Sequence, residues 1–123
     1  GTRTASITGA YVAVKLCLAD LAKKPDGIKP SAIEKILTGQ VAAVSLGVVD
    51  GKIFSDLCYE EDSRADTDLN LVARHDGTII EVQGTAEGAP LTRSELDQLV
   101  DQGLVNIEEL CLLQQQAVER ALQ

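Results

Sequence analysis

The pattern of hydrophobic positions predicts a helical start, a run of short strands and a helical end. Near the N-terminus apolar residues recur every three or four positions, which predicts a helix of about five turns. The stripe consists of Ile7, Ala10, Val14, Leu18 and Leu21. Other apolar residues lie off this stripe, so we expect the helix to be central in the fold, with Thr4 or Ser6 as its cap.

The middle of the chain predicts an antiparallel sheet. The expected strands are 41–49, 52–59, 69–74 and 78–84. The first is a continuous apolar run, typical of a strand buried on both faces. Asp50-Gly51 is a strong signal for a two-residue hairpin. His75 precedes Asp-Gly in a second turn and is expected to face solvent, while the glycines of 84–88 predict a flexible loop that ends the sheet.

The remaining segments predict a connector and closing helices. Prolines and glycines in 25–39 favour a surface connector with a short helical stretch. Thr92 and Glu95 form a capping box, and Gly103 is expected to end or kink the helix that follows. A second helix is expected from about Val105, with its last turns facing solvent or another subunit. The fold class is therefore α/β (α+β), with an antiparallel or mixed sheet packed on helices.

Composition limits the classes of function. At 123 residues the chain fits one domain. Its net charge of -8 argues against bulk electrostatic binding of nucleic acid, which needs a cationic surface. Any contact with RNA must therefore be local or come from another chain.

The cysteines and the apolar segments indicate the compartment. Cys17, Cys58 and Cys111 are odd in number and widely spaced, as expected for reduced, buried thiols in a cytoplasmic protein. The apolar stretches look too short or too interrupted to span a bilayer, and the chain opens without a signal-peptide pattern. We expect a soluble protein with no membrane partner.

The segment 60–70 concentrates acidic residues between two apolar segments. Five carboxylates surround the single guanidinium of Arg64 within these eleven residues. One interpretation is a site for a divalent cation that neutralises the cluster, and the other is a solvated surface loop. Composition alone favours the loop, because charge runs usually face water.

The first residues of the chain also allow two interpretations. Gly1, Thr2 and Arg3, with further hydroxyl residues, lead directly into the predicted helix. Free backbone N–H groups at a helix start, together with an arginine fork, are suited to binding an anion. The alternative is an ordinary N-cap after a flexible terminus, and the motif alone leaves that alternative ahead.

Four segments, in order along the chain, strongly resemble the ribonuclease PH family of phosphate-dependent 3'-to-5' exoribonucleases. They are GTRTASITGA (1–10), VAAVS (41–45), YEEDSRADTDLN (59–70) and EVQGTAEG (81–88). The resemblance implies the ribonuclease PH-like fold, also called ribosomal protein S5 domain 2-like. It further implies an enzyme that trims tRNA precursors, releases nucleoside diphosphates, runs in reverse as a nucleotidyltransferase, and assembles as a homo-hexameric trimer of dimers.

The resemblance also assigns roles to individual residues. Gly1, Thr2 and Arg3, with Ser6 adjacent, are expected to bind the attacking inorganic phosphate. Asp62 and Asp68 are expected to bind Mg²⁺ and to give acid assistance at the scissile phosphate. Mg²⁺ retains several waters, so two aspartates and the substrate phosphate are a sufficient set of oxygen ligands.

The chain departs from the family pattern in its length, which is about half of the expected polypeptide. We expect 1–24 to be the phosphate-binding segment and last helix of a first subdomain, 25–39 a connector, and 40–123 a second subdomain with C-terminal helices. The resemblance places a further phosphate-binding arginine and the basic RNA-contacting surface in the missing N-terminal half, so the isolated chain is expected to be inactive. The alternative function is a non-catalytic ring or scaffold subunit.

Overall fold

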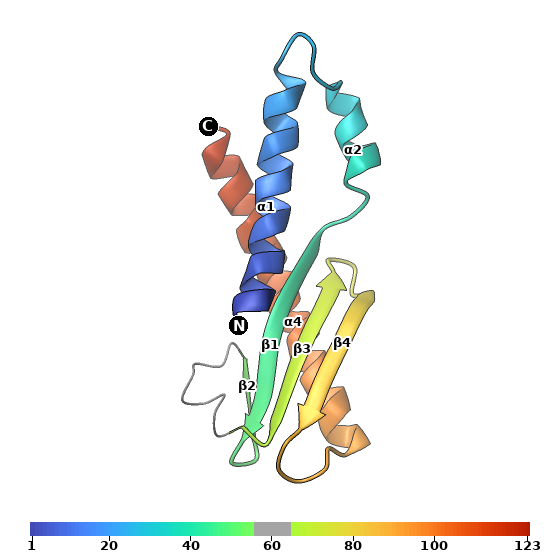
Figure 1. Cartoon of the computed structure of the whole chain (residues 1–123), viewed down its shortest axis with the longest axis vertical. Coiled ribbons are helices and arrows are strands. Elements are labelled where there is room, and N and C mark those ends of the chain that lie inside the picture. The colour runs from blue at the N-terminus through green and yellow to red at the C-terminus, as the bar shows by residue number, and fades with distance from the viewer. Residues whose placement is uncertain (56–64) are drawn as a thin grey trace.

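The computed structural model describes residues 1–55 and 65–123 of the chain. Its elements are α1 (Thr2–Ala22), a 3-10 turn (Pro30–Ala32), α2 (Ile33–Ile36), β1 (Val41–Val49), β2 (Lys52–Ser55), β3 (Thr67–Arg74), β4 (Ile79–Ala86) and α4 (Arg93–Ala121). The strands form one antiparallel sheet in the order β2-β1-β3-β4, and the long helix α4 runs behind it in Figure 1. The expected combination of an antiparallel sheet and packed helices is confirmed.

The first hairpin has the predicted turn. Asp50 and Gly51 have φ angles of 53° and 76°, the two left-handed conformations that a type I′ turn requires. The partner strand is described as far as Ser55, and the rest of the predicted strand 52–59 lies outside the described residues. His75 is exposed in the second turn, as expected.

The prediction of a loop at 84–88 is wrong for residues 84–86, which belong to β4. β4 continues to Ala86 because β3 already begins at Thr67, two residues earlier than predicted, and supplies partners for it. Asp68 thereby pairs with Thr85 on one side and with Gly47 of β1 on the other. The chain then turns, and the N–H groups of Glu87 and Gly88 donate to the carbonyl of Asp66.

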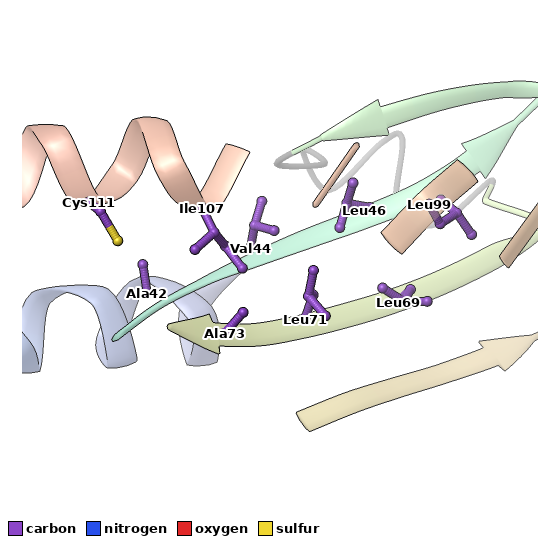
Figure 2. Packing of buried hydrophobic residues seen from close by; sticks show 9 residues of the cluster. All are labelled: Ala42, Val44, Leu46, Leu69, Leu71, Ala73, Leu99, Ile107 and Cys111. Carbon is purple, nitrogen blue, oxygen red and sulfur yellow. The ribbon is translucent and has the colours of Figure 1, made fainter. Parts of the chain in front are cut away.

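One face of the sheet forms the apolar core with α4. Figure 2 shows side chains of β1 and β3 pointing toward the helix. The largest fully buried side chains are Leu46, Leu69 and Leu71 of the two strands and Leu99 and Ile107 of α4. Because side chains alternate along a strand, the residues between these on β1 and β3 point to the other face. The predicted burial of β1 on both faces is confirmed, since six consecutive residues of it are buried.

The C-terminal segment is one continuous helix rather than two. Thr92 caps it as predicted, accepting a hydrogen bond from the Glu95 N–H at 3.1 Å. Gly103 does not end α4, and its missing side chain allows the helix to approach the sheet. A Cβ at that position would lie 2.6 Å from Leu71 Cδ2.

Helix α1 lies along the edge of β1. β2 pairs with β1 only from Leu46 onward, so the earlier part of β1 leaves backbone groups unpaired on that side. The Thr8 hydroxyl accepts from the Ala43 N–H at 3.0 Å and donates to the Ala43 carbonyl at 3.2 Å. Gln114 of α4 donates to the Val41 carbonyl at 2.9 Å and to the Thr8 carbonyl at 3.0 Å. Gln114 is buried against α1 and β1 of the same chain, so the expectation that the last turns of α4 face solvent or another subunit is wrong for this residue.

The expectation that α1 is a central helix is also wrong within these residues. Only Thr4 and Leu18 of α1 are buried, and Val14 of the predicted core stripe is 43% exposed. β1 and α4 contact one side of the helix, and nothing in the described part of the chain covers the other side. The charges in the segment had suggested that it is too interrupted to span a bilayer. Nevertheless, α1 is long and apolar enough to cross a membrane, judged by length and composition only, and core helices of soluble proteins meet the same criterion.

The cysteines differ in burial. Cys111 is buried in the core, as expected, and desolvation followed by the nearby charge of Glu108 raises the pKa of its thiol. Cys17 is exposed on α1, contrary to expectation, because it lies on the uncovered side of that helix. Cys58 lies outside the described residues.

Candidate functional site

The start of α1 has no side-chain cap. Gly1 occupies the N-cap position, and the first turn contains no acidic residue. The hydroxyls expected to cap the helix instead donate to carbonyls, that of Thr4 to Gly1 at 3.0 Å and that of Ser6 to Thr2 at 2.7 Å. The predicted side-chain cap is therefore wrong, and the first backbone N–H groups of the helix remain directed toward a ligand or solvent. With the helix dipole, such a terminus favours negative charge.

The face of the sheet opposite α4 is polar where α1 begins. Asp68 and Asn70 alternate on β3 with the buried leucines of the core, so they point to this face. The Ser45 hydroxyl on β1 donates to Asn70 Oδ1 at 2.8 Å and lies 3.3 Å from the Thr4 hydroxyl. This chain of hydrogen bonds connects the first turn of α1 to the two inner strands and fixes the orientation of the Asn70 side chain.

A pocket of about 220 Å³ lies where the helix start meets this polar face. It is lined by Gly1, Thr2, Arg3, Thr4, Ser45, Asp68 and Asn70. The two segments singled out in the sequence, the glycine-threonine-arginine start and the acidic segment, therefore meet at one pocket through Arg3 and Asp68. A larger cavity of about 470 Å³ adjoins it through Gly1, Thr4 and Ser45 and is mostly apolar.

Arg3 extends across the polar face to β4. Its Nη2 atom donates to both carboxylate oxygens of Glu81, each at 2.6 Å. Glu81 pairs with Val72 in the register of β4 with β3, and so lies one strand beyond Asn70 and Asp68. The arginine thus has a fixed partner at one nitrogen while it also lines the pocket.

The expected metal ligands are only partly described. Asp68 is half-buried beside the pocket and has interactions of its own, whereas Asp62 lies outside the described residues. Among the described residues no three His, Cys, Asp or Glu side chains converge to hold a metal. Among the residues that line the pocket, the carboxylate is that of Asp68, a ligand type that Mg²⁺ prefers, whereas the Asn70 oxygen already accepts from Ser45. This donor set fits Mg²⁺ as a partial site.

The structure separates one predicted residue from the pocket and adds others. Ser6 is exposed and does not line the pocket. Ser45, Asn70 and Glu81 were not singled out from the sequence, although they lie in segments that carried the resemblance. The alternation of leucine with polar residues from Asp68 to Leu71 was the available signal, since it places the polar set on one face.

A family comparison identifies the class of protein. The model described as 3' exoribonuclease family, domain 2, matches residues 39–106, which contain the whole sheet and the first turns of α4. The chain belongs to this 3' exoribonuclease family.

Relatives with about half of the aligned residues identical are proteins named ribonuclease PH. The chain is 49% identical to that of Saccharopolyspora erythraea over 118 residues, which cover 96% of this chain and 45% of the relative. It is also 49% identical to that of Rhodococcus erythropolis over 123 residues, with 96% and 44% covered. The chain therefore spans slightly less than half the length of these relatives.

Solved structures support the fold. A chain of an archaeal exosome core superimposes with a TM-score of 0.54 at 24% identity, covering 61% of this chain and 30% of that one. A chain of the Archaeoglobus fulgidus exosome with RNA bound to the active site superimposes with a TM-score of 0.50 at 26% identity, covering 57% and 27%.

Proposed function

We propose that this chain supplies the phosphate site and a catalytic carboxylate of a phosphate-dependent 3'-to-5' exoribonuclease. The enzyme would trim the 3' ends of tRNA precursors, release nucleoside diphosphates, and add nucleotides in the reverse direction. The observation that carries the proposal is the meeting of Arg3 and Asp68 at one pocket beside an uncapped helix start. The relatives named ribonuclease PH support the same activity.

Inorganic phosphate would bind at the start of α1. The free N–H groups of Thr2 and Arg3 and the helix dipole attract an anion there. The guanidinium of Arg3 adds charge-assisted hydrogen bonds. The amide of Asn70 supplies a further donor, because its oxygen already accepts from Ser45 and its nitrogen remains available toward the pocket.

Asp68 would act on the RNA. An oxygen of inorganic phosphate attacks the phosphorus of the last phosphodiester, and the bond from that phosphorus to the 3' oxygen of the preceding nucleotide breaks. That oxygen takes up the proton released by the attacking hydrogen phosphate, which the Asp68 carboxylate would relay, leaving a shortened RNA with a 3'-hydroxyl and one nucleoside diphosphate. Bound Mg²⁺, held by Asp68 and in our proposal Asp62, would neutralise charge on the reacting phosphates.

The rest of the longer polypeptide is part of this proposal. One side of α1 is apolar and exposed, including Ala10, Val14 and Cys17, which is unfavourable for a helix that remains in water. We infer that an additional N-terminal region packs on this side, as the length of the relatives suggests. With a net charge of -8, the chain also needs that region for cationic RNA-binding surface.

A product assay tests the proposal. The complete polypeptide is incubated with a tRNA precursor carrying a 3' extension, Mg²⁺ and inorganic phosphate, and the nucleotides released are separated by chromatography. We expect nucleoside diphosphates whose release requires phosphate. Arg3→Ala should raise the KM for phosphate, because the fork that binds the anion is lost, and the matched control Arg93→Ala should not. Release of nucleoside monophosphates without phosphate would contradict the proposal.

A non-catalytic ring subunit is the second candidate function. The likeness to chains of an archaeal exosome core and of an exosome supports it. We also propose a homo-hexameric ring for the catalytic alternative, so assembly alone does not separate the two. The product assay does separate them, because a scaffold subunit would release no nucleoside diphosphate in any assembled state.

A further inference from the structure

The ion pair between Arg3 and Glu81 joins elements that are far apart in the chain. Arg3 lies in the first turn of α1 and Glu81 on β4, so the arginine side chain passes over the polar face of the sheet. Both oxygens of Glu81 contact the same nitrogen, Nη2, at 2.6 Å. The carboxylate therefore holds the guanidinium at one corner.

The other donors of Arg3 remain available. Arginine carries five N–H donors on three nitrogens, and in the described part of the chain only Nη2 of Arg3 has a hydrogen-bond partner. Nε and Nη1 can each donate a charge-assisted hydrogen bond to an oxyanion, while Nη2, which belongs to both bidentate forks of the guanidinium, is shared with Glu81. Arg3 also lines the pocket with Asp68, so the arginine lies beside the region where an anion would enter.

We propose that Glu81 is a positioning residue that holds the Arg3 guanidinium over the pocket for inorganic phosphate. The inference rests on the proposed function and identifies how its phosphate site is prepared before the ligand arrives. A half-exposed arginine otherwise samples many rotamers, and ordering it when phosphate binds costs free energy. A partner that already fixes the side chain removes part of this cost.

Glu81 could instead weaken phosphate binding, and the two effects predict opposite changes in the Kd for phosphate. A carboxylate near an anion site repels phosphate and competes for Nη2, so a pure competitor would weaken phosphate binding. Removing a competitor tightens binding, whereas removing a positioning residue weakens it. The side chains of the pair are 49% and 37% exposed, so solvent screens both the repulsion of phosphate and the attraction between Arg3 and Glu81, and the sign of the measured change decides which effect is larger.

The test is a calorimetric titration of the complete polypeptide with inorganic phosphate, without RNA. Glu81→Ala should raise the Kd for phosphate about two- to fivefold, the range for an exposed ion pair. Glu81→Gln should retain most of the affinity, because the amide oxygen still accepts from Nη2. Glu34→Ala removes the same charge from the exposed helix α2 and should leave the Kd unchanged. Tighter phosphate binding in both Glu81 variants would overturn the inference.

A double-mutant cycle separates positioning of Arg3 from a general structural role. In an Arg3→Ala background, Glu81→Ala should cause no further loss of phosphate affinity, because the side chain to be positioned is gone. In the product assay, Glu81→Ala should raise the KM for phosphate and leave kcat at saturating phosphate unchanged. An equal loss in both backgrounds, or a loss confined to kcat, would contradict the inference.

The two proposals fail in different ways. If the unsubstituted protein binds no phosphate, the phosphate site itself is wrong and the proposed function falls with it. If that protein binds phosphate and releases nucleoside diphosphates, but Glu81→Ala leaves the Kd unchanged, only the role of Glu81 is refuted.

Discussion

The same strands supply two faces of the sheet with different properties. On β3, Leu69 and Leu71 point into the core against α4 and are almost completely buried, while Asp68 and Asn70 on the opposite face remain partly accessible beside the pocket. The apolar face stabilises the fold, because each buried leucine removes hydrocarbon from water. The polar face contributes hydrogen-bonding and charged groups at positions fixed by that core. Substitutions one residue apart should therefore separate stability from activity.

The largest expected effect is on turnover. Asp68→Asn keeps the size of the side chain but removes its charge and its ability to assist proton transfer. We expect nucleoside diphosphate release to fall by about 10²- to 10⁴-fold, with the thermal unfolding midpoint nearly unchanged. Asp66→Asn, an exposed neighbour in the same segment, is the control and should retain turnover to within about twofold. Full activity of Asp68→Asn would refute the proposed role of the Asp68 carboxylate in catalysis.

Leu71→Ala should affect stability on the opposite face. Leu71 is fully buried against α4, so truncation loses apolar contacts and leaves a cavity. We expect the free energy of unfolding in urea to fall by about 2–5 kcal/mol. Leu112→Ala, on the exposed side of α4, should change it by less than about 0.5 kcal/mol. Equal effects of the two substitutions would show that α4 does not pack as described.

Gly103→Ala should reveal the close approach of α4 to the sheet. The added Cβ would lie 2.6 Å from Leu71 Cδ2, an overpacking cost of about 1–3 kcal/mol that a gain in helix propensity of about 1 kcal/mol partly offsets. In the Leu71→Ala background the closest methyl group is absent and only the contact with Leu46 Cδ1 at 3.1 Å remains tight, so Gly103→Ala should cost much less than in the unsubstituted chain. A double-mutant cycle of Gly103→Ala and Leu71→Ala, with the free energy of unfolding measured in urea, gives the coupling between the two positions. Strictly additive effects would contradict the close approach.

Asn70→Asp should weaken phosphate binding with little change in stability. The new carboxylate still accepts from Ser45, which preserves the local hydrogen bond, but it places negative charge where we expect an anion. A phosphate titration should show a Kd raised by about fivefold or more at low salt, with a smaller change at high salt. Gln83→Glu, opposite Asn70 in the register of β4, adds the same charge outside the pocket lining and should change the Kd less.

The smallest predicted difference concerns two cysteines. Burial raises the pKa of the Cys111 thiol and shields its sulfur from reagents, whereas Cys17 is exposed on the surface of α1. Brief alkylation followed by peptide mass spectrometry should modify Cys17 first in this chain. In the complete polypeptide Cys17 should become protected, because we propose that α1 is covered there. Continued rapid modification of Cys17 would argue against that covering region.

Local patterns were sufficient for much of the fold. The strand β1, the hairpin at Asp50-Gly51 and the cap at Thr92 follow from short-range rules of burial, backbone conformation and hydrogen bonding, and all three are present. Gly103 shows the limit of such rules. A glycine within a helix usually indicates a point where the helix ends or bends. Only the position of Leu71, which a Cβ at residue 103 would meet at 2.6 Å, shows that glycine is needed there for packing.

The sequence by itself determined the strands, the turns and the two segments that carry the candidate chemistry, because these depend on neighbouring residues. The tertiary structure alone decided that α1 lies along an edge of the sheet, that Glu81 reaches Arg3, and that Ser45 orients Asn70. Those contacts join residues far apart along the chain, and their geometry depends on strand register and on how closely the helices approach. Local sequence patterns do not specify either quantity.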